Sequence, residues 1–218
     1  MSGAGDTALP ETLPIFPLTG VLLLPRGRLP LNIFEPRYLA MTRDAMGGER
    51  LIGMVQPSDP PVREMNPPVY PLGCAGRITS FSETDDGRFL ITLTGVSRFR
   101  IKEELPLLSG YRRVVADWDG FAADREPDEA NFDRSRLAQG LRTFFAQRQV
   151  EADWQAIEKA PGEHLVTSLA MMCPFAPNEK QALLEAKDLG ERARLLTALI
   201  EMTANAPAPD PDAAVTRH

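Results

Sequence analysis

The residues best suited to acid–base, nucleophilic or metal chemistry are few in this sequence and do not cluster. His164 is the one histidine away from the C-terminus, and it follows Glu163 in a segment of helical periodicity. That setting is typical of a surface histidine rather than of a catalytic base. Cys74 and Cys173 lie far apart with no C-x-x-C spacing, so we expect two buried, unreactive thiols and neither a zinc site nor a disulfide scaffold.

Motifs for nucleotide, dinucleotide and hydrolase chemistry are also missing from the sequence. It has no G-x-x-x-x-G-K-[ST] phosphate loop, no G-x-G-x-x-G fingerprint and no G-x-S-x-G elbow. No serine is placed to be activated by one of the four lysines, which are Lys102, Lys159, Lys180 and Lys187. The adjacent carboxylates of Asp85 and Asp86 precede a glycine and indicate a turn rather than a metal site. We therefore expect no catalytic residues, no metal and no cofactor.

The string Leu29-Pro-Leu-Asn-Ile-Phe-Glu-Pro-Arg-Tyr38 has the most unusual composition in the chain. In a structural interpretation, its aliphatic residues face a core and Pro36 begins a short helix, which the Gly47-Gly48 pair ends. Glu35 then forms an ion pair with Arg37 or another arginine. Glu35 and Pro36 are accordingly interpreted as structural residues.

The same string has a functional interpretation, which the sequence leaves open beside the structural one. Phe34, Arg37 and Tyr38 would form the aromatic and charged rim of a groove that binds polypeptide. These three residues are our candidates for peptide binding.

The distribution of charge favours a protein partner over a nucleic acid. The net charge is -6; residues 1–118 contain 13 Lys+Arg and 13 Asp+Glu, whereas the remainder contains 11 and 17. Nucleic-acid binders usually have a basic stripe, because phosphate contacts dominate their affinity. Arg98, Arg100, Arg112 and Arg113 could still form one local basic face. RNA or nucleotide binding is therefore kept as the alternative function.

The elements that must position these residues change in type near Gly120. Before it, short apolar runs alternate with period two, and after it apolar residues recur at three- and four-residue spacing. With 43% hydrophobic residues, the chain can build a sizeable core. We predict a flexible leader at residues 1–12, a β-rich barrel at 13–118, a helical bundle docked on it at 119–205 and a disordered tail at 206–218.

A hairpin is the best-defined unit of the β-rich half. An Asp-Asp-Gly turn at 85–87 joins two strands, and in the second strand Phe89, Ile91 and Leu93 point to one side. Gly95 interrupts this alternation. A glycine there predicts a bulge or bend of the kind that curls a small sheet into a barrel.

Four apolar stripes predict four helices in the second half. The stripes are Leu137, Leu141, Phe144 and Phe145; Leu165, Leu169 and Met172; Leu183 and Leu184; and Leu195, Leu196, Leu199 and Ile200. Capping boxes are expected at Asn178 with Gln181 for the third helix and at Asp188 with Glu191 for the fourth. Helices joined by such short links form a small bundle.

Several strings carry a resemblance to a known family. They are Leu13-Pro-Ile-Phe-Pro-Leu18, Val21-Leu-Leu-Leu-Pro25, Leu29-Pro-Leu31, Ile33-Phe-Glu-Pro-Arg-Tyr38, Gly73-Cys-Ala-Gly76, Asp86-Gly-Arg88, Gly95-Val-Ser-Arg-Phe-Arg100, Glu179-Lys-Gln-Ala-Leu-Leu-Glu185 and Glu191-Arg-Ala-Arg-Leu195. Together they resemble the N-terminal substrate-binding domain of Lon proteases, and above all the small proteins that consist of this domain alone. The likeness extends over residues 11–203.

The resemblance implies an α+β fold, in which a PUA-like, β-rich pseudobarrel is followed by a small C-terminal helical bundle. It further implies a non-catalytic protein- or peptide-binding module, such as an adaptor or a protein quality-control factor, because ATP hydrolysis and Ser/Lys proteolysis belong to later domains of Lon. The implied partners are unfolded or extended polypeptide segments and a protease or chaperone. The sequence itself predicts no membrane partner, and the charge balance disfavours nucleic acid, which remains the alternative.

The location expected for the protein is the cytoplasm. The longest aliphatic run is far shorter than the about 20 residues that span a bilayer. The N-terminus lacks the basic and apolar segments of a signal peptide. The oligomeric state is not predicted by any feature of the sequence.

Overall fold

A computed structural model describes residues 8–58, 66–129 and 131–205 of the chain. Its strands are β1 (Thr12–Pro17), β2 (Arg28–Ile33), β3 (Leu51–Val55), β4 (Leu72–Glu83), β5 (Phe89–Leu108) and β6 (Tyr111–Asp117). Its helices are α1 (Pro36–Gly47), the 3₁₀ helix η1 (Ala122–Arg125), α2 (Arg134–Gln147), α3 (Trp154–Lys159), α4 (Gly162–Met172), α5 (Pro177–Glu185) and α6 (Leu189–Asn205). Strands thus precede helices along the chain, apart from α1.

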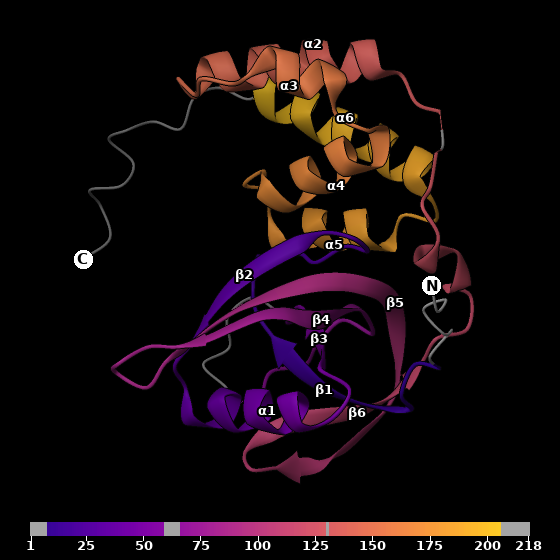
Figure 1. Cartoon of the computed structure of the whole chain (residues 1–218). Coiled ribbons are helices and arrows are strands. Elements are labelled where there is room, and N and C mark those ends of the chain that lie inside the picture. Colours follow the sequence, from indigo (N-terminus) through magenta and orange to yellow (C-terminus); the bar gives the residue numbers. More distant parts are fainter. Residues whose placement is uncertain (1–7, 59–65, 130, 206–218) are drawn as a thin grey trace, which may run out of the picture.

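The six strands form one sheet that closes on itself (Figure 1). They follow the order β2-β5-β4-β3-β1-β6, with β1 and β3 parallel and the other neighbours antiparallel. The first part of β5 pairs with β2 and β4, whereas its last part pairs with β6, which also pairs with β1. This double use of the 20-residue strand β5 closes the ring. The predicted α+β fold with a pseudobarrel is confirmed.

The β4–β5 hairpin has the predicted turn and the predicted irregularity. Gly87 in the turn has φ 79°, in the left-handed region that glycine adopts readily. Phe89, Ile91 and Leu93 are buried on one side of β5, as expected from their alternation. The register shifts between Ala75 and Gly76, where Gly95 lies opposite on β5. The bulge predicted at this position is therefore present, and β5 continues through it.

Among the described residues, the second half of the chain contains the four predicted helices and two more, the 3₁₀ helix η1 and α3. The helix α3 has no counterpart among the four predicted, because it is only six residues long and none of its residues is fully buried. In α4, Met172 is 80% exposed, and Cys173 is buried instead. The expectation that Met172 belongs to the buried stripe is wrong, since Leu165, Leu169 and Cys173 follow one another at intervals of four residues.

The start of α5 also differs from the prediction. Pro177 takes the first helical position, and the carboxylate of Glu179 accepts a hydrogen bond of 2.7 Å from the backbone N–H of Ala176. The predicted box of Asn178 with Gln181 is not formed, because the helix begins before Asn178 and Gln181 is buried against the barrel. At α6 the first half of the predicted box is present, with Asp188 Oδ1 accepting from the amide of Glu191 at 2.8 Å, whereas the Glu191 carboxylate accepts from the amide of Lys187 at 2.7 Å.

The helices meet the barrel through α5 and η1 (Figure 1). Gln181 Nε2 donates to the carbonyl of Leu72 at 3.2 Å, and Lys180 Nζ donates to the carbonyl of Gly20 at 2.9 Å. One hydrophobic cluster extends from the barrel and α1 into the helices, and a second, smaller one fills the barrel around Phe99. The packing of the two halves is therefore both apolar and hydrogen-bonded.

The predicted leader and tail lie largely outside the described residues, which exclude 1–7 and 206–218. Of the remaining leader residues, Leu9 packs against the cluster inside the barrel, and the carbonyl of Pro10 accepts from Trp118 Nε1 at 3.0 Å. Thr12 already pairs with Val115 as the first residue of β1. Regular structure thus begins one residue before the predicted boundary at 13.

Candidate binding cavity beside helix α1

Residues 34–38 lie where β2 ends and α1 begins. Pro36 occupies the first turn of α1, and Glu35 precedes it with extended backbone. Proline fits there because the first N–H groups of a helix have no intrahelical acceptor. Glu35 Oε2 accepts a hydrogen bond of 3.0 Å from Arg37 Nε, which is the ion pair of the structural interpretation. The Glu35 side chain is 44% exposed, so the pair lies at the surface.

The three residues proposed as a rim differ in burial. Tyr38 is 6% exposed, and its ring lies on that of Phe16 with centroids 4.2 Å apart. Phe34 is 61% exposed. The guanidinium carbon of Arg37 stands 4.5 Å from the centroid of the Tyr38 ring, in a cation–π contact. The three do not form one exposed rim, because α1 turns Tyr38 towards the core.

Arg37 and Tyr38 nevertheless line a common cavity of about 280 Å³ between the start of α1 and the β5–β6 hairpin. The lining residues are Pro17, Leu18, Thr19, Arg37, Tyr38, Pro57, Asn66, Pro67, Gly110, Tyr111 and Arg112. The hydroxyl of Tyr111 donates to Asp44 of α1 at 2.8 Å, which ties the hairpin to the helix. Phe34 is not among the residues that line this cavity.

The polar groups of this cavity are held by buried contacts. Arg112 is 7% exposed; its guanidinium donates to the carbonyl of Pro67 at 2.7 Å and pairs with Glu104. Burial raises the pKa of Tyr38, and burial together with the hydrogen bond to Asp44 raises the pKa of Tyr111 to about 12. Both tyrosines are therefore neutral at physiological pH, and the two arginines are paired with Glu35 and Glu104. Such a cavity can receive hydrogen-bond acceptors.

Sequence reasoning identified only part of this cavity. No sequence motif marks Tyr111 or Pro67 as site residues, and the sequence suggests Arg112 only as part of a basic face. The signal that could have located the hairpin is the Ser109-Gly110 pair, whose φ angles are 49° and 84° as a tight turn requires. No local pattern, however, indicates that this turn meets α1.

The four arginines suggested for RNA binding do not form one basic face. Arg98 is buried and pairs with Asp124 at 2.8 Å, and Arg112 is buried beside Glu104. Arg100 is exposed and Arg113 is half-buried. Since two of the four guanidinium groups are neutralised inside the protein, the basic surface on which the alternative function depends is not formed.

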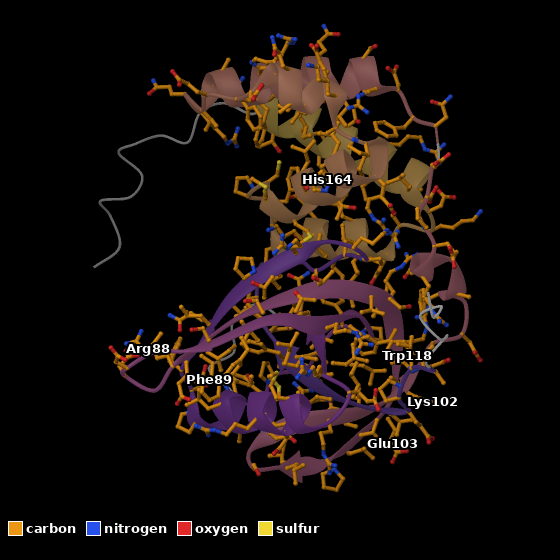
Figure 2. All side chains as sticks on the ribbon, in the orientation of Figure 1. Arg88, Phe89, Lys102, Glu103, Trp118 and His164 are labelled. Atoms are coloured by element: carbon orange, nitrogen blue, oxygen red, sulfur yellow. The ribbon has the colours of Figure 1, made fainter. Side chains whose placement is uncertain are left out.

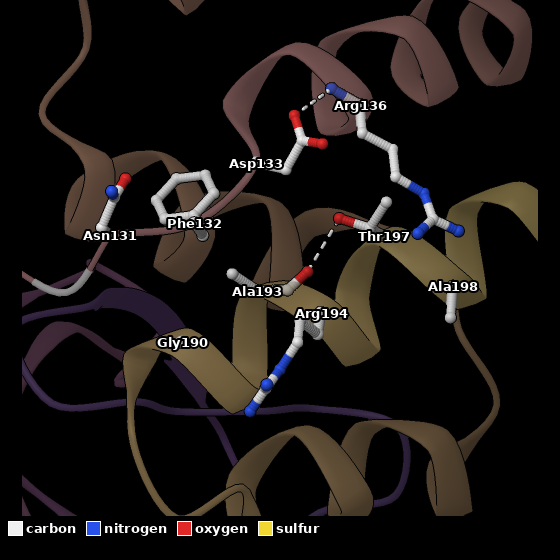
Figure 3. A pocket seen from close by; sticks show the side chains of 9 residues that line it. All are labelled: Asn131, Phe132, Asp133, Arg136, Gly190, Ala193, Arg194, Thr197 and Ala198. Carbon is white, nitrogen blue, oxygen red and sulfur yellow. Dashed lines mark hydrogen bonds between the residues drawn. The ribbon is translucent and has the colours of Figure 1, made fainter.

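A larger hollow of about 610 Å³ lies between α2 and α6 (Figure 3). Its polar groups serve the helices themselves: Asp133 accepts from the backbone N–H of Arg136, and the Thr197 hydroxyl donates to the carbonyl of Ala193. Arg136 pairs with Glu201. Gly190, Ala193 and Ala198 line it together with the polar side chains of Asn131 and Arg194.

The residues that could do chemistry are dispersed. Lys102 and His164 lie on different parts of the molecule, and His164 is exposed (Figure 2). Both cysteines are buried and free, as predicted; burial raises the pKa of Cys74, and it raises that of Cys173 to about 11. In the described ranges, no group of three or more His, Cys, Asp or Glu side chains is arranged to hold a metal ion.

A closed, mixed sheet joined to a helical bundle defines this chain as an α+β protein with a pseudobarrel. A family model for the substrate-binding domain of the ATP-dependent protease La (LON) matches residues 12–202. The chain therefore belongs to the Lon substrate-binding domain family, as its sequence motifs predicted.

Curated relatives and solved structures are similar to the chain over most of its length. Lon protease 2 of Myxococcus xanthus is 28% identical over 203 residues, which cover 88% of this chain and 24% of that protein. The Lon protease of Parabacteroides distasonis is 28% identical over 197 residues, which cover 87% and 24%. The chain spans about a quarter of the length of these relatives.

Two solved structures share the fold. The Lon N-terminal domain protein from Xanthomonas campestris has a TM-score of 0.60 at 24% identity, covering 86% of this chain and 97% of that one. The N-terminal domain of the Mycobacterium avium complex Lon protease has a TM-score of 0.61 at 15% identity, covering 87% and 97%. A search of the described helices for one long and apolar enough to cross a membrane finds no such helix.

Proposed function

We propose that this chain is a non-catalytic module that binds unfolded or extended polypeptide segments at the end of the pseudobarrel where α1 meets the β5–β6 hairpin. It acts as an adaptor or quality-control factor in the cytoplasm and delivers such segments to a protease or chaperone. Membership of the Lon substrate-binding domain family supports the polypeptide as ligand. The observation that carries the location is the cavity shared by Arg37, Tyr38 and the hairpin.

The surroundings of the cavity suit a polypeptide. Leu107 and Leu108, at the end of β5 just before the turn whose Gly110 lines the cavity, are 52% and 40% exposed. Tyrosine and arginine, which line the cavity, are residue types that dominate the energetics of protein interfaces. An extended segment can place one side chain in the cavity and lay its neighbours on these leucines.

Binding to an unfolded protein tests this proposal. The full chain is titrated into fluorescein-labelled, reduced and carbamidomethylated α-lactalbumin, and fluorescence anisotropy is followed. Leu107→Ser together with Leu108→Ser should weaken binding about tenfold, because the variant loses apolar contact beside the cavity. Both leucines are exposed, so the fold should be preserved.

Met172→Ser together with Met202→Ser is the matched control on the helical half. These methionines are 80% and 68% exposed, and their replacement should leave the affinity unchanged. Equal affinity of the leucine variant and the wild type would contradict the location of the site. Absence of binding by the wild-type chain at tens of micromolar would contradict the proposed function itself.

A further inference from the structure

Strand β2 (Arg28–Ile33) has one unpaired edge. It pairs with β5 on one side, and among the described residues no strand pairs with its other side. The core-facing leucines of β2, Leu29 and Leu31, pack against the main hydrophobic cluster and yet are only partly buried. Such side chains are covered from both sides in a central strand, so their partial exposure indicates that this edge is open to solvent.

The hydrogen bonds between β2 and β5 show which backbone groups point to the open edge. The amide of Gly95 donates to the carbonyl of Gly27 at 2.9 Å, so these two residues form a hydrogen-bonded pair. In an antiparallel ladder, such pairs alternate with pairs whose N–H and C=O groups point away from the partner strand. The register continues without a shift through β2, so the backbone groups of Arg28, Pro30 and Asn32 point to the open edge.

These three residues offer the hydrogen-bonding pattern of a sheet edge. Arg28 and Asn32 each present an N–H and a C=O, whereas Pro30 presents a C=O alone. A proline is tolerated at this position because the N–H that it lacks would point away from β5. Backbone donors and acceptors at every second residue of a strand match the backbone of another extended chain, which is the ligand that unpaired sheet edges bind.

Apolar side chains flank the open edge on both faces of the sheet. Leu29 and Leu31 lie on the core side. On the other face, Leu90 is 46% exposed and pairs with Asn32 in the ladder, and Phe34 is exposed where β2 ends. Of the three residues that the sequence suggests for peptide binding, Phe34 is the one that does not line the cavity beside α1. A strand added to β2 would pack its side chains against these apolar residues.

We infer that the open edge of β2 binds an extended, apolar segment of the bound polypeptide as an added strand, with Phe34 as an aromatic contact at its end. The segment exchanges backbone hydrogen bonds with the outward-pointing residues of β2, and every second side chain packs against Leu29 and Leu31. The inference rests on the proposed function, because the ligand is the polypeptide that the chain binds. Since β2 leads into α1, whose Arg37 lines the cavity, the edge is a second contact close to the first along the chain.

Proline substitutions at the open edge test the role of the backbone. Asn32→Pro removes an N–H that β5 does not use, so β2 should keep its pairing with β5. The probe is fluorescein-labelled, carbamidomethylated α-lactalbumin, titrated with the full chain. It should bind Asn32→Pro about tenfold more weakly than Asn32→Thr, which keeps the N–H. Conversely, Pro30→Thr supplies the missing donor and should bind about fivefold more tightly than the wild type.

A side-chain variant tests the aromatic contact at the end of β2. Phe34→Ser should weaken binding of the same probe about fivefold, because Phe34 is 61% exposed and available to the ligand. Val150→Ser is the matched control on the helical half; Val150 is 49% exposed, and its replacement should leave the affinity unchanged. If Asn32→Pro melts early in circular dichroism, Pro30→Thr tests the backbone of the edge independently.

The failure of this inference differs from the failure of the proposed function. Equal binding by folded Asn32→Pro and Asn32→Thr overturns the inference, and so does an affinity of Pro30→Thr no higher than that of the wild type. The proposed function stands in either case if the wild type binds the unfolded protein and the double leucine variant of the β5–β6 hairpin binds it more weakly. If the wild type does not bind the unfolded protein, the proposed function fails.

Discussion

The ion pair between Arg98 and Asp124 should contribute strongly to the attachment of the helices to the barrel. The two side chains are 7% and 8% exposed. Asp124 accepts hydrogen bonds from the backbone N–H and Nε of Arg98, each at 2.9 Å, and from its NH2 at 2.8 Å. Arg98 also donates to the carbonyls of Leu184 and Ala186 at the end of α5. Asp124→Ala therefore breaks a contact that links β5, η1 and α5.

The expected loss of stability follows from the burial of the charge that remains. Removing one partner of a buried ion pair costs about 3–5 kcal/mol. Since Arg98 keeps its carbonyl partners at α5, we expect the lower end of that range, about 3 kcal/mol. For a chain of this length, each kcal/mol lowers Tm by about 2–4 °C, so Asp124→Ala should melt about 6–12 °C below the wild type.

Thermal unfolding of the full chain, followed by circular dichroism at 222 nm, measures this loss. Arg136→Ala is the control: Arg136 is 62% exposed in its pair with Glu201, and its replacement should leave Tm nearly unchanged. Replacing Arg98 by Met and Asp124 by Leu together should restore much of the stability, because neither member of the pair is then left buried without the other. A fall of less than about 2 °C for Asp124→Ala would refute this reasoning.

Three further substitutions have defined outcomes. Glu35→Ala should cost less than about 1 kcal/mol in urea unfolding because its ion pair lies at the surface, and a loss of about 3 kcal/mol would contradict this. Tyr111, whose pKa burial and Asp44 raise to about 12, ionises near pH 10 when unfolded, so the stability that it contributes below pH 10 is lost as the pH rises towards 12. Tyr111→Phe should therefore show a smaller loss over that interval, and equal losses would contradict the assignment. Gly95→Ala should destabilise the fold by about 1–3 kcal/mol or prevent folding, because its Cβ would lie 2.0 Å from the carbonyl oxygen of Leu24; an unchanged Tm would refute this.

Elements that depend on local interactions could be predicted from the sequence. The turn at Gly87, the start of α1 at Pro36 and the cap of α6 at Asp188 all lie where their residue types indicate. Each depends on a few neighbouring residues: a positive φ, a missing N–H or a side chain that accepts from the next turn. The bulge opposite Gly95 could also be predicted from the local sequence, although the way it bends the sheet into a barrel could not.

Burial of individual side chains was decided by the tertiary structure. Arg98 alternates with Phe99 along β5 in the manner of a solvent-facing residue, yet it is buried because η1 and α5 cover that position. Tyr38 resembles a rim residue in the sequence, yet α1 turns it onto Phe16. Met172 follows the helical spacing of Leu165 and Leu169, yet it is exposed because the buried side of the segment continues to Cys173 instead.

For the candidate cavity, too, the sequence predicts some features and the tertiary structure decides the others. The sequence by itself determined that residues 34–38 are unusual, that a helix begins among them and that a Lon-like fold follows. It could not determine that Arg37 and Tyr38 share a cavity with Tyr111 and Arg112, because the strands between them must first close into a ring. Contacts between segments so distant in the chain depend on how whole elements pack, and neighbouring residues carry little information about that packing.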